Sequence, residues 1–200
     1  MAARNRLPPW HEQLQLRDGR ELLIRPIRPD DAGPLRAGFS LLQPEEVRQR
    51  FLHALTELTP DMAERLCRPD PRREFVLVAA EPLPPGEALV GAVARASIIA
   101  GDDDHTVARD AEFAILVSHF IAGQGLGRHL MRRLVRWARG KNLERLSGDV
   151  LENNQAMLAL ADSLGFQRRR AADTPGLMRV VLDLKPATAR PSSGTQVGTA

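Results

Sequence analysis

The stretch Ala111-Glu112-Phe113-Ala114-Ile115-Leu116-Val117, followed by Gly123-Gln124-Gly125-Leu126-Gly127-Arg128, decides the fold of this chain. Its first part is an apolar run that predicts a strand, and its second part is a glycine-rich turn that leads into a basic helix. Glycines at positions 123, 125 and 127 leave little side-chain bulk over the first helical turn. The unpaired backbone N–H groups there can reach an anion at the positive end of the helix dipole. The stretch therefore predicts a pyrophosphate site for a phosphate-bearing cofactor.

The segments on both sides of this stretch alternate between strand and helix patterns, which predicts a mixed α/β (α+β) domain. Short helices are expected to begin at Pro29, Pro44 and Pro60, and a hairpin is expected around the proline-rich turn at residues 82–86. Longer helices are expected at residues 125–140 and 154–164. Strands are expected at residues 21–27, 74–80, 89–99, 111–117, 146–151, 166–171 and 177–184.

Length and composition favour a single domain. The chain has 200 residues, 43% of them hydrophobic, which is enough to bury one sizeable core. We expect an N-terminal extension at residues 1–15, one domain at 16–184 and a disordered C-terminal tail at 185–200, which is small, polar and interrupted by prolines. No apolar run approaches the roughly 18 residues of a membrane span, and the start lacks the apolar core of a secretory signal. A cytoplasmic protein without a membrane partner is therefore expected.

Composition argues against several other classes of site. Cys67 is the only cysteine, so an internal disulfide framework and a multi-cysteine metal site are excluded. The histidines show no paired ligand spacing, so no metal is expected. The formal net charge is only +3, and no aromatic residues interleave with the arginines of the helix at 125–140. Nucleic-acid binding is therefore disfavoured, although a DNA-binding module stays as a minor alternative.

Two better-known phosphate motifs do not fit the glycine turn. A dinucleotide-binding G-x-G-x-x-G that starts at Gly123 puts Arg128 at the third glycine, and one that starts at Gly125 puts Leu130 there. Close helix packing needs a residue without a side chain at that place. A Walker loop needs Lys followed by Ser or Thr, and no such pair closes the turn. A plain glycine-rich turn without a ligand is the simpler alternative.

Glu112 is a carboxylate within an otherwise apolar run. On simple alternation it shares a face with Ala114 and Leu116. If the carboxyl is partly buried, its pKa rises toward neutrality, which suits a base that takes a proton from an amine. The residues alone favour a simpler account, a solvent-facing position at the start of a strand. His119, just past the strand, is the second candidate for a base.

Two further side chains have a structural and a functional interpretation. Asn154 opens the helix expected at 154–164, where asparagine is a favourable N-cap, and it could also hydrogen-bond the amide arm of a cofactor. Arg128 lies in the first turn after the glycines and could approach a phosphate. The later arginines of that helix recur at three- and four-residue spacing, which is typical of a solvated face.

Together these motifs resemble the GCN5-related N-acetyltransferase (GNAT) superfamily over residues 16–184. The acyl-CoA signature of that family, a strand followed by Gln/Arg-x-x-Gly-x-Gly/Ala, falls on Ala122-Gly123-Gln124-Gly125-Leu126-Gly127. Its later Asn plus Leu-Gly-Phe element falls on Asn154 and Leu164-Gly165-Phe166. Finer features resemble the acetyltransferase domain of bacterial Pat-type protein lysine acetyltransferases, and they lie at residues 24–31, at Arg50-Phe51, at 111–114 and at 157–161.

The resemblance implies the acyl-CoA N-acyltransferase fold, with a mixed, mostly antiparallel central sheet of six to seven strands flanked by helices. It implies acetyl-CoA as acyl donor, Glu112 as catalytic base, and a protein lysine as acceptor, with a small-molecule amine as the alternative. The residues that it implies for acetyl-CoA binding are Ile115, Leu116, Val117, Gly123, Gln124, Gly125, Leu126, Gly127, Arg128 and Asn154.

Two departures from the family pattern affect these expectations. Ala122 stands where the signature usually has Gln or Arg, which removes a side-chain contact but keeps the backbone cradle. The chain has no tyrosine, and Ala161 occupies the position from which many members are thought to protonate the leaving thiolate. A non-catalytic acyl-CoA sensor is therefore a further alternative.

Overall fold

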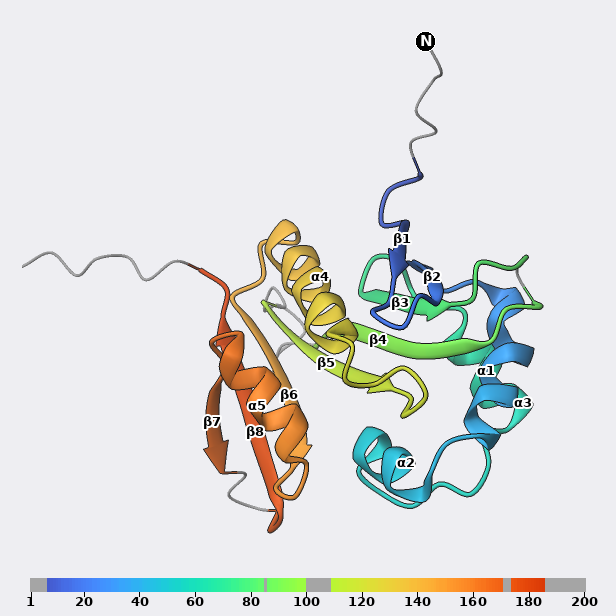
Figure 1. Ribbon diagram of the computed structural model, residues 1–200. Helices are drawn as coiled ribbons and strands as arrows, with labels where there is room; N and C mark the ends of the chain where they lie inside the picture. Colours follow the sequence, from blue (N-terminus) through green and yellow to red (C-terminus); the bar gives the residue numbers. More distant parts are fainter. Residues whose placement is uncertain (1–6, 85, 100–108, 171–173, 186–200) are drawn as a thin grey trace, which may run out of the picture.

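The computed structural model describes residues 7–84, 86–99, 109–170 and 174–185. They form an eight-stranded sheet in the order β1-β2-β3-β4-β5-β6-β8-β7 (Figure 1). Every neighbouring pair is antiparallel except β5 and β6, which run parallel. The mixed, mostly antiparallel sheet is confirmed, with one strand more than predicted. The strands are β1 (Glu12–Gln15), β2 (Glu21–Pro26), β3 (Glu74–Ala80), β4 (Val90–Ile98), β5 (Asp110–Val117), β6 (Arg145–Leu151), β7 (Gln167–Arg170) and β8 (Leu177–Asp183).

Helices cover both faces of this sheet. The core between the sheet and one helical layer contains Leu130 and Leu134 of α4 together with Leu158 of α5. On the other face, side chains of the α1–α3 region pack over β3, β4 and β5. None of the helices in the described ranges combines the length and the apolar character needed to cross a bilayer. The helices are η1 (Pro29–Asp31), α1 (Ala32–Ser40), α2 (Pro44–Phe51), α3 (Pro60–Leu66), α4 (Leu126–Gly140) and α5 (Gln155–Ser163).

The additional strand is β1, which lies within the predicted extension at residues 1–15. It pairs with β2 at the edge of the sheet, from Glu12 opposite Ile24 to Gln15 opposite Glu21. Glu12 also accepts a hydrogen bond from Arg133 of α4 at 2.6 Å, and its carboxylate contacts His129 at 2.9 Å. Part of the expected extension is therefore an ordered edge of the domain. The predicted C-terminal tail lies, apart from Lys185, outside the described residues.

Helix α4 buries an apolar stripe against the sheet. Leu126, Leu130, Leu134 and Trp137 are all buried, and the ring of Trp137 stacks on Phe75 of β3 with centroids 5.5 Å apart. These contacts hold the first turn of α4 at a fixed place beside the end of β5. The helix thereby positions the glycine loop.

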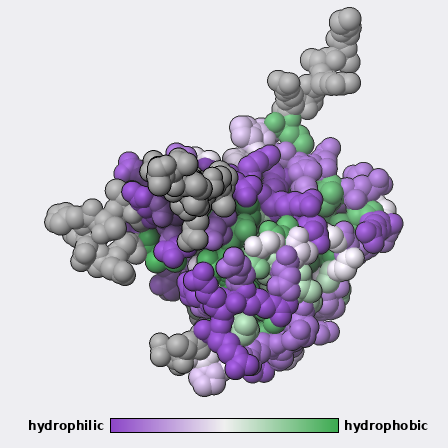
Figure 2. Space-filling model, turned by 90° about the vertical axis from the view of Figure 1, so that its left-hand side faces the viewer, coloured by the Kyte–Doolittle hydropathy of each residue, from purple (hydrophilic) through white to green (hydrophobic). Residues whose placement is uncertain are grey.

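The opposite edge of the sheet is protected by charge. All four residues of β7 are exposed, and three of them are arginines. Figure 2 views the molecule from this side, where the surface is mainly hydrophilic. Charged edge strands of this kind disfavour strand addition by another chain.

A buried ion pair fixes the chain where β2 turns into η1. The guanidinium of Arg25 donates two hydrogen bonds of 2.7 Å to the carboxylate of Asp31, and both residues are at most 1% exposed. Cys67 is buried close by, and burial raises the pKa of its thiol to about 11. The thiol therefore acts as apolar filling in the core.

Candidate active site

A gap between β5 and β6 is the central feature of the candidate site. The two strands pair only over residues 110–112 of β5, and then they diverge (Figure 1). The ring of Phe113 lies at the point of divergence, where a Cβ added to Gly148 of β6 would stand 2.7 Å from it. Phe113 also packs edge-on against Phe166, with ring centroids 5.5 Å apart. Beyond Glu112, the β6-facing edge of β5 is therefore open to an extended ligand.

The glycine loop forms a second open surface at the end of this gap. Gly123 and Gly125 have positive φ values of 74° and 83°, and a Cβ at either residue would meet nothing within 4 Å. Gly125 is the N-cap of α4, and because it has no side chain, no capping hydrogen bond occupies the first N–H groups of the helix. No N–H group of residues 122–128 donates a hydrogen bond to a described residue. These free donors at the positive end of α4 fit a phosphate group.

Gln124 points away from that surface. Its Nε2 donates to Asp18 at 2.8 Å, and its Oε1 accepts the N–H of Arg17 at 2.9 Å. Arg20 in the same β1–β2 turn donates to the carbonyl of Phe120 at 2.7 Å. The turn thus braces the loop from outside. Only the backbone of Gln124 faces the predicted anion site.

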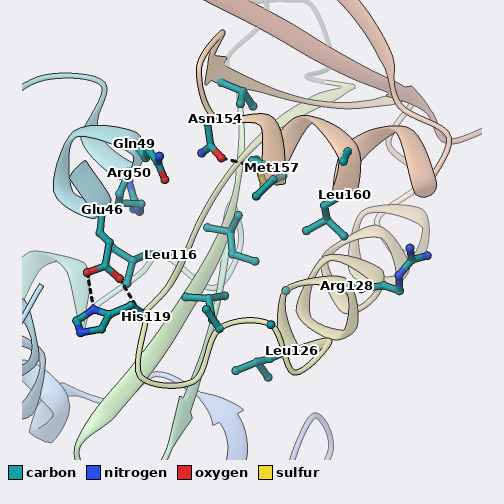
Figure 3. A pocket seen from close by; sticks show the side chains of 18 of the residues that line it. Glu46, Gln49, Arg50, Leu116, His119, Leu126, Arg128, Asn154, Met157 and Leu160 are labelled. Carbon is teal, nitrogen blue, oxygen red and sulfur yellow. Dashed lines mark hydrogen bonds and ion pairs between the residues drawn. The ribbon is translucent and has the colours of Figure 1, made fainter. Parts of the chain in front are cut away.

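A cavity of about 620 Å³ joins the open strand edge to the glycine loop. Figure 3 shows one wall on α5, with Asn154, Met157 and Leu160, and the facing wall on α2, with Glu46, Gln49 and Arg50. The remaining lining comes from β5, β6 and the loop into α4. Of the predicted cofactor-binding residues, those that line the cavity are Ile115, Leu116, Val117, Gly123, Gly125, Leu126, Gly127, Arg128 and Asn154.

Glu112 lies beside the gap at the last residue of β5 that still pairs with β6. Phe113 and Ile115 point toward α4 and α5, so Glu112 and Leu116 face the α2 side of the sheet. The carboxylate is 48% exposed and contacts Arg179 of β8 at 3.4 Å. It is therefore half-exposed and paired, and an apolar enclosure does not surround it.

The sequence profile of the Acetyltransferase (GNAT) domain matches residues 21–167. The chain belongs to the GNAT acetyltransferase family. Acetyltransferase PA5475 of Pseudomonas aeruginosa is 29% identical over 164 residues, which are 82% of this chain and 83% of that protein. Acetyltransferase Pat of Mycolicibacterium smegmatis is 28% identical over 178 residues, which are 89% of this chain and only half of that protein.

Solved structures agree with this GNAT assignment. The GNAT domain of S. lividans PAT superposes with a TM-score of 0.76 at 25% identity, over 89% of this chain and 99% of that one. A cAMP-binding acyltransferase from Mycobacterium smegmatis superposes with a TM-score of 0.56 at 25% identity, over 92% of this chain and 50% of that one. The protein is accordingly an N-acetyltransferase close to the Pat type, and domains of this family bind acetyl-CoA.

Asn154 of this acetyltransferase is the N-cap that the sequence predicted, and its contact with a cofactor stays a prediction. Its Oδ1 accepts the N–H of Met157 at 3.0 Å, which makes it the N-cap of α5. The same residue lines the cavity. Arg128 also lines the cavity, and its exposed side chain makes no hydrogen bond or ion pair with a described residue. Both are placed to contact a ligand.

The two departures from the GNAT pattern have different structural consequences. Ala122 lines the cavity, so the missing Gln or Arg side chain would have reached it. Ala161 is fully buried in the core and is absent from the cavity wall. Within the described ranges, no three His, Cys, Asp or Glu side chains cluster in a way that could hold a metal ion.

Sequence reasoning missed the α2 wall of the acetyltransferase site. Glu46 accepts the N–H of His119 at 2.6 Å and contacts its Nδ1 at 2.9 Å, so α2 is tied to the loop after β5 (Figure 3). The only sequence signal at Arg50 is the Pat-like Arg50-Phe51 pair. The acidic first turn of α2 carries no signal of its distant partner.

Proposed function

We propose that this acetyltransferase moves the acetyl group of acetyl-CoA to a primary amine by direct attack, with a protein lysine as acceptor. The observation that carries the proposal is the cavity itself. It runs from the free N–H groups at the start of α4 along the open edge of β5 to Phe113. Glu112 does not itself line the cavity, but it is the next residue of that strand and the last one that pairs with β6. An anion site, an extended groove and a carboxylate thus follow one another in space.

Each part of the chain has a separate task in binding. The backbone N–H groups of residues 123–128, with the Arg128 side chain, hold the diphosphate. The open backbone of residues 115–117 pairs with the amide-containing arm, and Asn154 contacts that arm from α5. The apolar walls at Met157 and Leu160 exclude water from it. Acetyl-CoA supplies an activated thioester carbonyl at the far end of these contacts.

Glu112 is the base in this proposal. A lysine ammonium, with a pKa near 10.4, must lose a proton before its nitrogen can attack. Glu112 takes that proton directly or through water, a nitrogen–carbon bond forms, and the carbon–sulfur bond breaks with its electron pair on sulfur. Arg179 contacts Glu112, Asp149 and Ser147, which fixes the carboxylate beside the gap. The coenzyme A thiolate leaves without being protonated by a tyrosine.

Similarity to Pat-type acetyltransferases supports a protein lysine as acceptor. Two carboxylates, Glu46 and Asp149, line the cavity and also suit a small cationic amine, which is the second candidate. A non-catalytic acyl-CoA sensor is the third, because the chain lacks tyrosine.

The test combines acetyl-CoA calorimetry with a transfer assay against amine and protein panels. Acetyl transfer that is lost in Glu112→Gln, while acetyl-CoA affinity stays unchanged, supports the proposal. Acetyl-CoA binding without transfer to any acceptor supports the sensor. Absence of acetyl-CoA binding contradicts both.

A further inference from the structure

Arg50 occupies a distinctive place on the α2 wall. It lies in the last turn of α2, lines the main cavity, and also borders a small apolar pocket together with Leu116 and Phe51. Figure 3 shows it on the α2 wall, across the cavity from Asn154 and Met157. Because Leu116 shares its face of β5 with Glu112, Arg50 belongs to the half of the cavity from which an acceptor would approach.

The other charged residues at this end of the cavity have partners. Glu46 contacts His119 at 2.9 Å, and Asp149 contacts Arg179 at 3.2 Å. Arg50 makes no hydrogen bond and no ion pair with any described residue. Its nitrogens are not among the enclosed, unpartnered polar atoms of the described chain, so they reach accessible space. The cavity wall thus contains a cation that has no ion-pair partner among the described residues.

The surroundings of Arg50 make this charge costly to maintain. The neighbouring pocket is lined largely by apolar side chains. The guanidinium carbon lies 4.9 Å from the ring centroid of Phe51, a cation–π contact that offsets only part of this cost. Arg95, which lines the same small pocket, already has Glu74 as its partner. Burial, with a smaller effect of Arg95, lowers the pKa of Arg50 to about 10, so the group is still charged at neutral pH. A half-buried cation without a partner lowers stability, which is typical of a group kept for a ligand.

We propose that Arg50 is the carboxylate-binding residue of the acceptor half of the cavity. The planar guanidinium matches a carboxylate with two parallel hydrogen bonds, which a point charge such as lysine cannot reproduce. The carboxylate is carried either by the acyl group of the donor or by the amine acceptor, close to the reacting atoms. This inference rests on the proposed function and adds a substrate preference to it. The phosphate groups are assigned to the opposite end, at the glycine loop.

The test compares Arg50→Met with Arg48→Met. Arg48 lies on the same helix, its side chain is 55% exposed, and it does not line the cavity, so it is a matched control. One arm measures by calorimetry the binding of succinyl-CoA and of butyryl-CoA, which match in length and differ in the carboxylate. The other arm measures acetyl transfer to N-α-acetyl-lysine and to N-α-acetyl-lysinamide. These arms separate the two sources of the carboxylate.

In one of the two pairs, we expect the wild type to bind or acetylate the ligand with the carboxylate at least about tenfold better than its neutral counterpart. This factor is equivalent to one charge-assisted hydrogen bond. Arg50→Met should abolish that preference, whereas Arg48→Met should keep it. The inference is overturned if, for both pairs, the wild type and Arg50→Met show the same ratio between the carboxylate ligand and its neutral counterpart. If neither acyl-CoA binds, the proposed function itself fails.

A ligand-free measurement tests Arg50 independently of acyl-CoA binding. Removal of an unpartnered cation is expected to raise the unfolding temperature of Arg50→Met by about 2–4 °C, which corresponds to roughly 1 kcal/mol in a chain of this size. Arg48→Met should unfold like the wild type. A lower unfolding temperature for Arg50→Met would assign the residue a structural role and overturn the inference.

Discussion

Gly127→Ala should separate folding from cofactor binding, because the two effects have opposite signs. Gly127 is the second residue of α4, and its φ lies outside the left-handed region. A Cβ there would lie 3.3 Å from Cδ2 of Leu160 and 3.9 Å from Cγ2 of Val117, both on the cavity wall. Leu160 needs to move by only a few tenths of an ångström. Alanine is the better helix former by up to about 1 kcal/mol, so the free energy of unfolding should stay constant or rise slightly.

Acetyl-CoA binding should weaken in the same variant. The new methyl would lie against the cavity wall at Leu160 and Val117, beside the first turn of α4, and we expect it to displace a phosphate from at least one charge-assisted hydrogen bond. Such a bond contributes about 1.5–3 kcal/mol, which corresponds to about 10- to 100-fold in Kd. Calorimetry gives the affinity and urea unfolding gives the stability. Gly140→Ala is the matched control, since it lies in the same helix with nothing within 4 Å of the added Cβ. Unchanged acetyl-CoA affinity in Gly127→Ala would refute the assignment of the diphosphate to this turn.

Three further predictions concern the base, the buried ion pair and the lone thiol. Glu112→Gln should lower kcat by about 10²–10⁴-fold, as measured by steady-state acetyl transfer, because general-base catalysis contributes that range. Asp31→Asn should lower the free energy of unfolding in urea by about 3–5 kcal/mol, because it leaves Arg25 buried without its counter-charge. Cys67 should react slowly with a thiol reagent at pH 8 in the folded protein and faster as the pH rises through about 11, because its raised pKa keeps the thiol protonated below that value.

Each of these has an outcome that contradicts it. Full activity of Glu112→Gln at neutral pH would exclude that base and direct attention to His119. A wild-type stability of Asp31→Asn would mean that Arg25 finds another partner. Rapid modification of Cys67 at pH 8 would show that the core opens easily around α3.

The sequence was most informative where one physical cause dominates. The stripe of α4 and the apolar strands β3, β4 and β5 follow from the pattern of apolar residues, and the glycines at 123 and 125 have the positive φ that their residue type favours. β1 was missed because Glu-Gln-Leu-Gln offers one apolar side chain, and an edge strand needs no more. Backbone pairing with β2 holds it there.

The remaining parts of the site depend on contacts that no local pattern encodes. Glu46 and His119 are 73 positions apart in sequence, and their contact places α2 on the cavity. Gln124 was expected to face the cofactor because it stands in the motif, but Asp18 and Arg17 bind its side chain from the β1–β2 turn. Both outcomes were decided by tertiary packing.

Arg133 shows why the amino-terminal residues cannot be trimmed at a boundary drawn from composition. It is 7% exposed within α4, and its two acceptors are the carboxylate of Glu12 and the carbonyl of Trp10. A fragment that began at residue 16 would leave this guanidinium buried without these two acceptors. The free energy of unfolding would fall by about 3–5 kcal/mol, out of the 5–15 kcal/mol typical of a folded protein. Glu12 of the short first strand is thus the counter-ion of the helix that follows the glycine loop.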